Sequence, residues 1–532
     1  MAFIDSRALA DGTLIERDLC IIGAGPAGIA IAREFIKSGM RVALLESGDV
    51  APDDGPQGLA AGESIGLPYP PLDKVRIRAF GGSTWHWGGN IRPLEEIDFE
   101  ERDWIPHSGW PIGRDILDPY YKRARPIFGV PDTVFNEDIW RRVIGSPWNT
   151  GNTDKAAILN QLFHTVGGAG RFSGDLWRDP LEKASALEIY HHATAMEVTL
   201  KDSHRSVSEI PVRTANGRNI RFRAKAYVLA AGGIETPRFL LLSNRQESAG
   251  VGNRADLVGR YFMEHLTVPN YARFYPANTS LPLGYYRGVD RDWGETWGIL
   301  RMSDREMRDH HLPNVRFQIS SEINEFNKDV ERPGMQSLRT LLGLQTSPKG
   351  DDLGRHIANM IADIDQVADA AWYRILHHPN YPLRYVDVVH IGEQTPNPDS
   401  RVKLSSRRDR YGQQMCVLDW RIQRLDSDGA WRTAQRLKVG LAKAGLGRLD
   451  VNFDKSVFAK FSPKPHFHHM GTTRMHDDPA KGVVDVNCRV HGLGNLFIAG
   501  SSVFPTGGNA NPTLTLTALA IRLADHLKKE FT

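Results

Sequence analysis

The first clear pattern of apolar positions lies near the N-terminus. An apolar run over residues 19–22 predicts a buried strand, the glycine-rich sequence GAGPAG follows it, and apolar residues at helical spacing then continue to Gly39. The next apolar run, RVALLE, predicts a second strand. Residues 18–48 are therefore expected to form one βαβ unit, the building block of a parallel sheet covered by helices.

Further along the chain the pattern changes to short alternating runs. Residues 187–231 alternate apolar and polar positions around an Asn216-Gly217 hairpin signal and end in the apolar strand AYVLAAGG, which we expect to return to the first sheet. Between residues 267 and 462 the runs VRFQIS, YVDVVHIG, RVKLS and QMCVLDWRI are separated by charged turns. This part predicts an antiparallel sheet.

Two later segments have helical periodicity. Residues 353–376 carry apolar side chains at spacings of three and four, which favours a helix that faces the core, with a contact between copies of the chain as the alternative. Residues 512–528 predict a C-terminal helix, with Pro512 at its first position and Asn511 as its N-cap.

Composition narrows the class of protein. The 532 residues include 41% hydrophobic and 24% charged residues, as in ordinary globular proteins. Because 66 Lys and Arg nearly balance 63 Asp and Glu, neither nucleic acid nor an anionic membrane is expected as the main partner. The most apolar stretch, residues 20–30, is too short for a membrane span. No signal peptide precedes it, so a cytoplasmic location is expected.

The three cysteines add little chemistry. Cys20, Cys416 and Cys488 are far apart and have no metal-ligand spacing. We therefore expect a reducing compartment, no disulfide framework and no bound metal.

The strongest local motif is G-x-G-x-x-G between the first predicted strand and helix. Gly23 permits the tight turn, Gly25 lets the backbone approach a pyrophosphate, and Gly28 lets helix and strand pack closely. Glu46, at the end of the next strand, is placed to bind a ribose hydroxyl and to repel a 2′-phosphate. The motif predicts a dinucleotide site but does not choose between NAD and FAD.

Three further segments make that choice. They are FGGSTWHWGGN, the pair VLAAGGIETPRFLLLSN and EQTPNPDSRVKL, and the C-terminal HFHHMGTTRM with GNLFIAGSSVFPTGGNANPTLTLTALA. Together these segments resemble the glucose-methanol-choline (GMC) family of FAD-dependent oxidoreductases. The stretch LVGRYFMEHL resembles the end of the family's FAD-binding region. Within the family the motifs are most similar to the pyranose 2-oxidase branch and its bacterial sugar and C-glycoside 3-oxidising relatives.

The resemblance implies a catalytic pair. The family's catalytic histidine in H-x-x-G-T falls on His468, and its second catalytic position falls on Asn511 in ANPTLT. An uncharged imidazole suits the removal of a hydroxyl proton while the C–H hydride moves to flavin N5. Substrate contacts are expected from His466, His468 and Asn511.

The glycine motif and the resemblance together imply the FAD contacts. His86 lies near the position at which pyranose 2-oxidases attach FAD through histidine, but here Trp85 interrupts their S-T-H-W motif, so we predict FAD held without a covalent bond. The expected cofactor residues are Gly23, Gly25, Ala27, Gly28, Glu46, Ser83, Thr84, His86, Trp87, Gly88, Asn90, Val198, Ala231, Gly500, Asn511, Pro512 and Thr513.

The expected fold is α/β, with a Rossmann-type FAD-binding domain (GMC fold) and an α+β substrate domain built on an antiparallel sheet. Residues 1–110, 187–266 and 463–532 are assigned to the FAD-binding domain, 111–186 to a lid or subdomain, and 267–462 to the substrate domain.

The expected activity is oxidation of a secondary ring hydroxyl, at C2 or C3 of a pyranose or glycoside, to a ketone. Oxygen or another acceptor would then reoxidise FAD. The alternatives are a family member acting on choline, a sterol or an aryl alcohol, and a flavoprotein without catalytic activity. Assembly into a homo-oligomer is left open.

Overall fold

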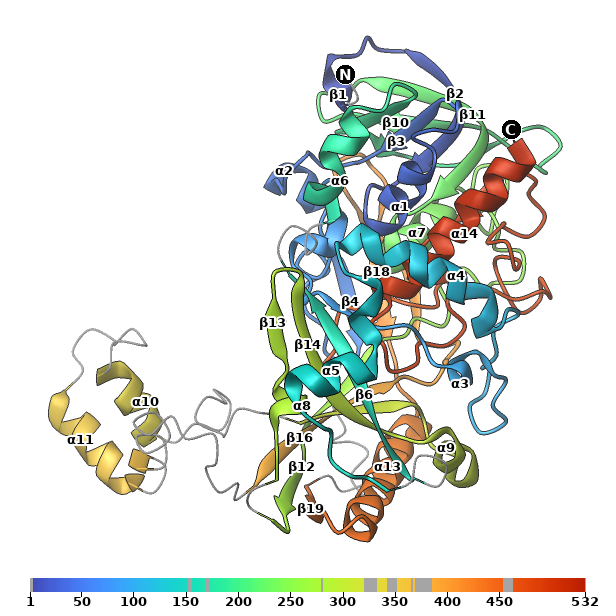
Figure 1. Cartoon of the computed structure of the whole chain (residues 1–532). Helices are drawn as coiled ribbons and strands as arrows, with labels where there is room; N and C mark the ends of the chain where they lie inside the picture. Colours follow the sequence, from blue (N-terminus) through green and yellow to red (C-terminus); the bar gives the residue numbers. More distant parts are fainter. Residues whose placement is uncertain are drawn as a thin grey trace.

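The fold is built around two large sheets, one above the other in Figure 1. The computed structural model describes residues 3–151, 156–167, 173–278, 281–319, 333–341, 352–364, 367–368, 385–452 and 463–531. Within these residues no helix combines the length and the apolar character needed to cross a bilayer.

The first sheet has nine strands and contains the predicted βαβ unit. β2 (Leu14–Ile22), α1 (Pro26–Glu34) and β3 (Val42–Leu45) follow one another, and β2 and β3 pair in parallel. The strand order is β1-β7-β3-β2-β11-β10-β8, with β20 beside β11 and β9 beside β10. The other strands are β1 (Phe3–Asp5), β7 (Leu187–His191), β8 (Thr194–Ala195), β9 (Thr199–Leu200), β10 (Val207–Arg213), β11 (Asn219–Leu229) and β20 (Leu496–Ile498).

Helices cover this sheet. All four residues of β3 are buried, as expected for a parallel strand with both faces covered. The C-terminal helix α14 (Thr513–Phe531) packs against α1 and α4 (Arg114–Ala124), and Figure 1 shows α14 lying beside α1. α6 (Ser173–Glu182) also packs against α1. The chain further forms α2 (Asp54–Gln57), α3 (Glu96–Phe99) and α7 (Gly232–Leu242).

The second sheet has eight strands and its pairings are antiparallel, which matches the sheet expected for the substrate domain. Its order is β19-β12-β16-β15-β14-β6-β5, with β13 beside β14, and α13 (Arg424–Lys443) packs on it. Its strands are β5 (Asn90–Ile91), β6 (Ile158–Val166), β12 (His265–Pro276), β13 (Val289–Arg291), β14 (Gly294–Met302), β15 (Val315–Ile319), β16 (Val386–Glu393) and β19 (Gly447–Val451). Short helices α5 (Glu137–Ile144), α8 (Gly284–Arg287) and α9 (Asp304–His310) lie nearby.

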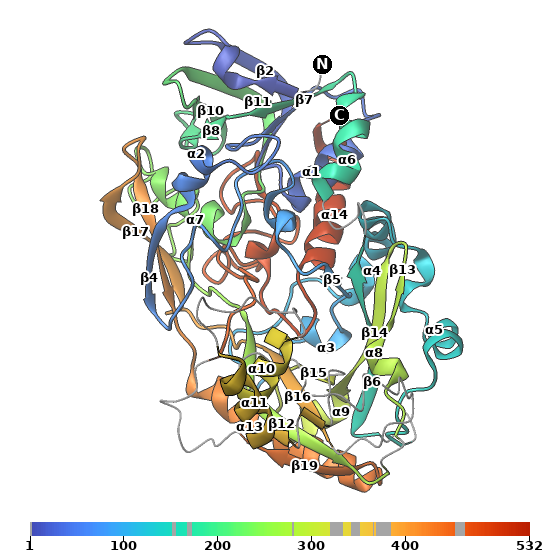
Figure 2. The same ribbon diagram turned by 90° about the vertical axis from the view of Figure 1, so that its left-hand side faces the viewer.

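The segment expected to form a lid, residues 111–186, is divided between the two bodies. α4 packs on α14, and β6 is a strand of the eight-stranded sheet, paired along its whole length with β14. Figure 2 shows α4 beside α14 and β6 beside β14.

Two strands expected in the antiparallel sheet lie elsewhere. β17 (Arg401–Arg408) and β18 (Gln414–Trp420) pair with each other and, through β18, with β4 (Gly62–Gly66) in a separate three-stranded sheet. The reason is that α7 packs on both β17 and β18, so these strands bury their apolar side against the first body. Strand-like alternation predicted the strands but not their partners.

The helix expected to face the core does not do so. α11 (Leu353–Ala362) packs against α10 (Pro333–Leu341), yet Leu353 is 59% exposed and Ile361 is 65% exposed. In Figure 1 this helix pair stands outside the body formed by the two large sheets. Apolar periodicity reports which side of a helix is apolar, not what covers it. Residues 365–366 and 369–376 of the expected helix lie outside the described residues.

Candidate active site

A cavity of about 360 Å³ lies where the carboxyl ends of the first sheet's strands meet the catalytic segment. It is lined by the last residue of each of three strands, namely Ile22 of β2, Leu45 of β3 and Leu229 of β11. In open α/β sheets, ligands bind at this edge. Its lining also includes residues 466–469 and 511–513, from the segment expected to carry the catalytic residues.

The glycine motif has the geometry that a dinucleotide requires. Gly23 has a φ of +107°, and a Cβ there would lie 2.6 Å from the carbonyl oxygen of Ala230. A Cβ on Gly28 would lie 1.9 Å from the carbonyl oxygen of Gly23, so only glycine allows α1 to pack so closely. A Cβ on Gly25 would meet no atom within 4 Å, and Gly25 lines the cavity, so the backbone is open to a ligand there.

The N-terminus of α1 adds a site for negative charge. Gly25 is its N-cap and offers no side-chain hydrogen bond to the first turn, and Pro26 stands at the first helical position. Backbone N–H groups at a helix N-terminus that no side chain caps are suited to a phosphate.

Glu46 is buried at the end of β3, as the motif predicts. Its Oε2 accepts a hydrogen bond from the Ala24 backbone N–H at 3.1 Å, and its Oε1 accepts one from the Gly48 N–H at 2.8 Å. These bonds fix the carboxylate at the wall of the cavity. A carboxylate has about four acceptor positions, so Glu46 can still accept ribose hydroxyls.

The glycine and tryptophan loop closes over this motif. A Cβ on Gly82 would lie 2.9 Å from the Cα of Gly25, so the two glycine segments touch. Fourteen of the seventeen predicted cofactor residues line the cavity, namely Gly23, Gly25, Ala27, Glu46, Ser83, Thr84, His86, Trp87, Gly88, Ala231, Gly500, Asn511, Pro512 and Thr513.

Three predicted cofactor residues do not line the cavity. Gly28 lies in the first turn of α1, directly after the lining residue Ala27, and packs against Gly23. Asn90 is in β5, where its Oδ1 accepts a hydrogen bond from Thr165 Oγ1 at 2.7 Å. Val198 is buried, and its backbone N–H donates to Ser243 Oγ at 2.8 Å. Tertiary contacts therefore engage the Asn90 side chain and the Val198 backbone N–H.

His468 and Asn511, the predicted catalytic pair, are 43 positions apart in the sequence and in contact in the structure. Asn511 Nδ2 lies 3.1 Å from His468 Nε2, and both residues line the cavity. Asn511 is not the N-cap expected from the sequence, because α14 begins at Thr513 and the Asn511 Oδ1 accepts a hydrogen bond from Arg316 Nη1 at 2.8 Å. His466, the expected substrate residue, stacks on His468 with ring centroids 5.5 Å apart.

Sequence reasoning missed three residues that contact this pair. His265 Nδ1 lies 2.7 Å from His468 Nδ1, Arg316 holds Asn511, and Glu264 Oε2 accepts hydrogen bonds from the backbone N–H groups of His466 and His468. One signal was available for Arg316, since a charged residue inside the apolar strand VRFQIS needs a buried partner.

Burial dominates the electrostatics of this cluster. It lowers the pKa of His468 well below its usual value, and the neighbouring imidazoles and the Arg316 charge lower it further. Burial, and next the Arg316 charge, lowers the pKa of His265 to about 3. Burial also raises the pKa of the Glu264 carboxyl to about 7. Both histidines are therefore uncharged at neutral pH.

The fold and this cavity define a dinucleotide-dependent oxidoreductase, and comparisons with known proteins give its family. Residues 396–520 match the C-terminal family model described as GMC oxidoreductase. The chain is 24% identical to 2-methyl-1,2-propanediol dehydrogenase of Mycolicibacterium austroafricanum, across 97% of this chain and 96% of that protein. It is 34% identical to the C-glycoside 3-oxidase of Arthrobacter globiformis over 126 residues, 23% of each chain.

Among solved structures, a formate oxidase covers 98% of this chain with a TM-score of 0.59 at 17% identity, and 99% of that structure is covered. This likeness shows the shared fold. The protein belongs to the GMC oxidoreductase family. It is an FAD-dependent enzyme that oxidises alcohols, as CH–OH donors. The glycine cradle, the open backbone at Gly25 and the buried Glu46 fit FAD.

Proposed function

We propose that this enzyme oxidises a secondary ring hydroxyl of a pyranose or glycoside, at C2 or C3, to a ketone. The observation that carries the proposal is the pair formed by His468 Nε2 and Asn511 Nδ2, 3.1 Å apart on the cavity wall. The sugar class is supported by the branch that the motifs resemble and by the C-glycoside 3-oxidase relative.

FAD, when bound, supplies the acceptor for the hydride of the alcohol. The residues that would hold it are Gly23, Gly25 and the N-terminus of α1 for the phosphates, and Glu46 for the ribose. Residues 82–84 and 86–88 and the start of α14 line the same cavity as the catalytic pair. A helix N-terminus carries partial positive charge, which favours negative charge on a nearby group.

His468 is proposed as the base that takes the hydroxyl proton on Nε2, and its neighbours support that assignment. His265 Nε2 lies 2.7 Å from the carbonyl oxygen of Gly508. A carbonyl only accepts, so His265 carries its hydrogen on Nε2, and the neutral ring has none on Nδ1. His265 Nδ1 then accepts the hydrogen of His468 Nδ1, 2.7 Å away. Since His468 is neutral too, its Nε2 is left as a lone-pair base.

A second chain of contacts leads to the same assignment from the other side. An arginine only donates, so the oxygen of the Asn511 amide is the atom that faces Arg316 Nη1, at 2.8 Å. The amide nitrogen then faces His468 Nε2 as a donor. A bare Nε2 is the form of His468 that can accept from it. Two obligate partners, a carbonyl and a guanidinium, thus favour one tautomer of His468.

In the proposed step, the substrate hydroxyl donates to His468 Nε2, and Asn511 Nδ2 donates to the substrate oxygen. The imidazole takes the proton as the hydride leaves the adjacent carbon. His466 is proposed to contact the sugar, because it lines the cavity and stacks on His468. Oxygen or another acceptor is proposed to complete the cycle.

A non-sugar alcohol is the second candidate substrate. The relative matched over almost the whole chain is named a 2-methyl-1,2-propanediol dehydrogenase, whereas the glycoside relative matches over 126 residues. The base and its partner would serve either substrate.

The test is anaerobic reduction of the flavin in the purified enzyme, monitored as the loss of its visible absorbance. The substrates compared are pyranoses, glycosides, choline, an aryl alcohol and a vicinal diol. Fastest reduction by a pyranose or glycoside, with a 2- or 3-keto product by NMR, is expected. Preference for a diol or choline would overturn the sugar class. Failure of every alcohol to bleach the flavin would favour the non-catalytic alternative.

A further inference from the structure

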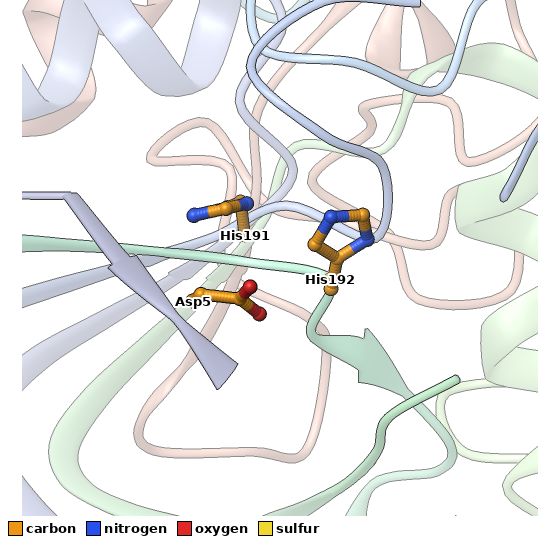
Figure 3. A group of neighbouring side chains, drawn as sticks. All are labelled: Asp5, His191 and His192. Atoms are coloured by element: carbon orange, nitrogen blue, oxygen red, sulfur yellow. The ribbon is translucent and has the colours of Figure 1, made fainter. Parts of the chain in front are cut away.

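A second polar cluster lies outside the catalytic pair, at the edge of the first sheet. Asp5 ends β1 and His191 ends β7, and the two residues are direct partners in the parallel pairing of these strands. His192 follows His191. Figure 3 shows the Asp5 carboxylate beside the two imidazole rings. One ligand atom from each of the three side chains lies within 4.8 Å of the other two.

The carboxylate of Asp49 adjoins both rings. His191 Nδ1 lies 3.0 Å from Asp49 Oδ1, and His192 Nε2 lies 3.2 Å from Asp49 Oδ2. Both nitrogens are buried and lie at ion-pair distance from Asp49, but these contacts do not have the geometry of good hydrogen bonds, and His192 is only 3% exposed. A buried imidazole nitrogen without a hydrogen bond is costly in a native protein and calls for an explanation.

We propose that Asp5, His191 and His192, with Asp49 completing the set, form a binding site for a divalent first-row transition-metal ion such as Zn²⁺. Ligand bonds of about 2.0–2.2 Å at tetrahedral angles place neighbouring ligand atoms about 3.3 Å apart. The contacts of Asp49 with the two rings are close to that spacing but lack hydrogen-bond geometry. Two imidazoles with carboxylates suit such an ion, whereas Mg²⁺ and Ca²⁺ prefer oxygen ligands.

The charges around the cluster are compatible with a cation. Arg7 donates four hydrogen bonds to the two oxygens of Asp5, three from its guanidinium and one from its backbone N–H. Two carboxylates and one guanidinium leave one net negative charge. Because these bonds use the acceptor positions of the carboxylate, an ion at Asp5 would replace one of them.

The ion would join three segments near Glu46, the predicted ribose ligand, and hydrogen bonds connect two of them to it. The Gly48 N–H donates to Glu46 Oε1, the His192 N–H donates to the Gly48 carbonyl, and the Ala193 N–H donates to the Glu46 carbonyl. The metal would therefore tie the edge strand β1 and the end of β7 to the loop that holds Glu46. Its role is structural, and it takes no part in the proposed reaction.

The test is calorimetric titration of the metal-stripped holoenzyme with Zn²⁺, followed by metal analysis after dialysis. One Zn²⁺ per chain is expected, with excess Mg²⁺ and Ca²⁺ unable to compete. His192→Ala and Asp49→Asn should each weaken binding by about 100-fold, in the upper range seen when metal sites lose supporting groups. His204→Ala is the matched control, because His204 contacts Glu247 and is outside the cluster.

Retained flavin absorbance in each variant shows that it has folded, and Asp49→Asn keeps the shape of the side chain it replaces. The proposal is overturned if the parent binds no stoichiometric Zn²⁺, or if both cluster variants bind it like the parent. Binding that survives in these variants but is lost in His468→Ala would place the ion at the active-site histidines, and this result also overturns the proposal.

Discussion

His265 and His468 face each other through the same ring atom: their Nδ1 nitrogens lie 2.7 Å apart, and the rings are nearly perpendicular, at 85°. Between two such atoms only one can carry the hydrogen. The carbonyl of Gly508, 2.7 Å from His265 Nε2, decides which one does. The contact makes His265 a positioning residue for the proposed base.

Replacement of His265 tests this role. His265→Gln can accept from His468 and donate to Gly508, so anaerobic flavin reduction should stay near the parent rate. His265→Leu should slow it by roughly 100-fold or more, since a histidine base in the wrong tautomer loses most of its activity. ¹⁵N NMR of histidine-labelled enzyme should show hydrogen on His468 Nδ1 in the parent. Equal rates in the Gln and Leu variants would refute the role of His265.

Removal of the base itself gives a second prediction. His468→Ala should keep its FAD and slow flavin reduction by roughly 10²- to 10⁴-fold, the usual size of a general-base contribution. His476→Ala, on the same segment but outside the cavity lining, is the control. A His468→Ala enzyme that reduces its flavin as fast as the parent would exclude His468 as the base and leave the FAD site unaffected.

The parent's pH profile follows from the lowered pKa of His468. A histidine with a lowered pKa stays unprotonated at neutral pH and can act as a base there. It loses this activity only when the pH falls below the usual histidine range. Flavin reduction should therefore be flat near neutral pH and decline in acid. The decline should vanish in His468→Ala.

Asn511→Asp should move that acid limb. The new carboxylate would accept from Arg316 and place an oxygen beside His468 Nε2. A nearby negative charge stabilises the imidazolium and raises its pKa. Flavin reduction should thus become slow at neutral pH and recover as pH rises, whereas Asn511→Ala should be slow with an unmoved acid limb. Stopped-flow reduction between pH 5 and 9 distinguishes the two.

Glu46→Ala should release FAD more easily. The substitution removes an acceptor for the ribose and frees the N–H groups of Ala24 and Gly48. Hydrogen bonds to a charged group contribute about 1.5–3 kcal/mol, so FAD affinity should fall roughly 10- to 100-fold. Fluorescence of released flavin during dialysis measures the change. Glu63→Ala, in β4 outside the cavity lining, should retain FAD like the parent.

FAD is predicted to leave the chain on acid or heat denaturation. His86 lines the cavity, but Trp85 interrupts the S-T-H-W motif in which pyranose 2-oxidases attach FAD. The measurement is flavin fluorescence of the denatured chain on a gel. Fluorescence that stays with the chain, and is lost in His86→Ala, would show a covalent bond at this position.

The sequence predicted the βαβ unit, the glycine motif and Glu46 at the end of the next strand, and the family resemblance implied that His468 and Asn511 act together. These features depend on short-range rules or on motifs. Turn geometry at Gly23, periodicity in α1 and the spacing within HFHHMGT are contained in a few neighbouring residues, so they can be recognised without knowing the rest of the fold.

Only the tertiary structure decided what surrounds these residues. His265 reaches His468 across 203 positions, and Arg316 reaches Asn511 across 195. The same holds for Val198, whose N–H is bonded to Ser243, for β17 and β18, which join β4, and for the apolar side of α11, which is exposed. Periodicity and local motifs describe a segment's own shape and apolar side. Which distant segment meets that side depends on how the whole chain packs, so the tautomer of His468 could be read only from the folded protein.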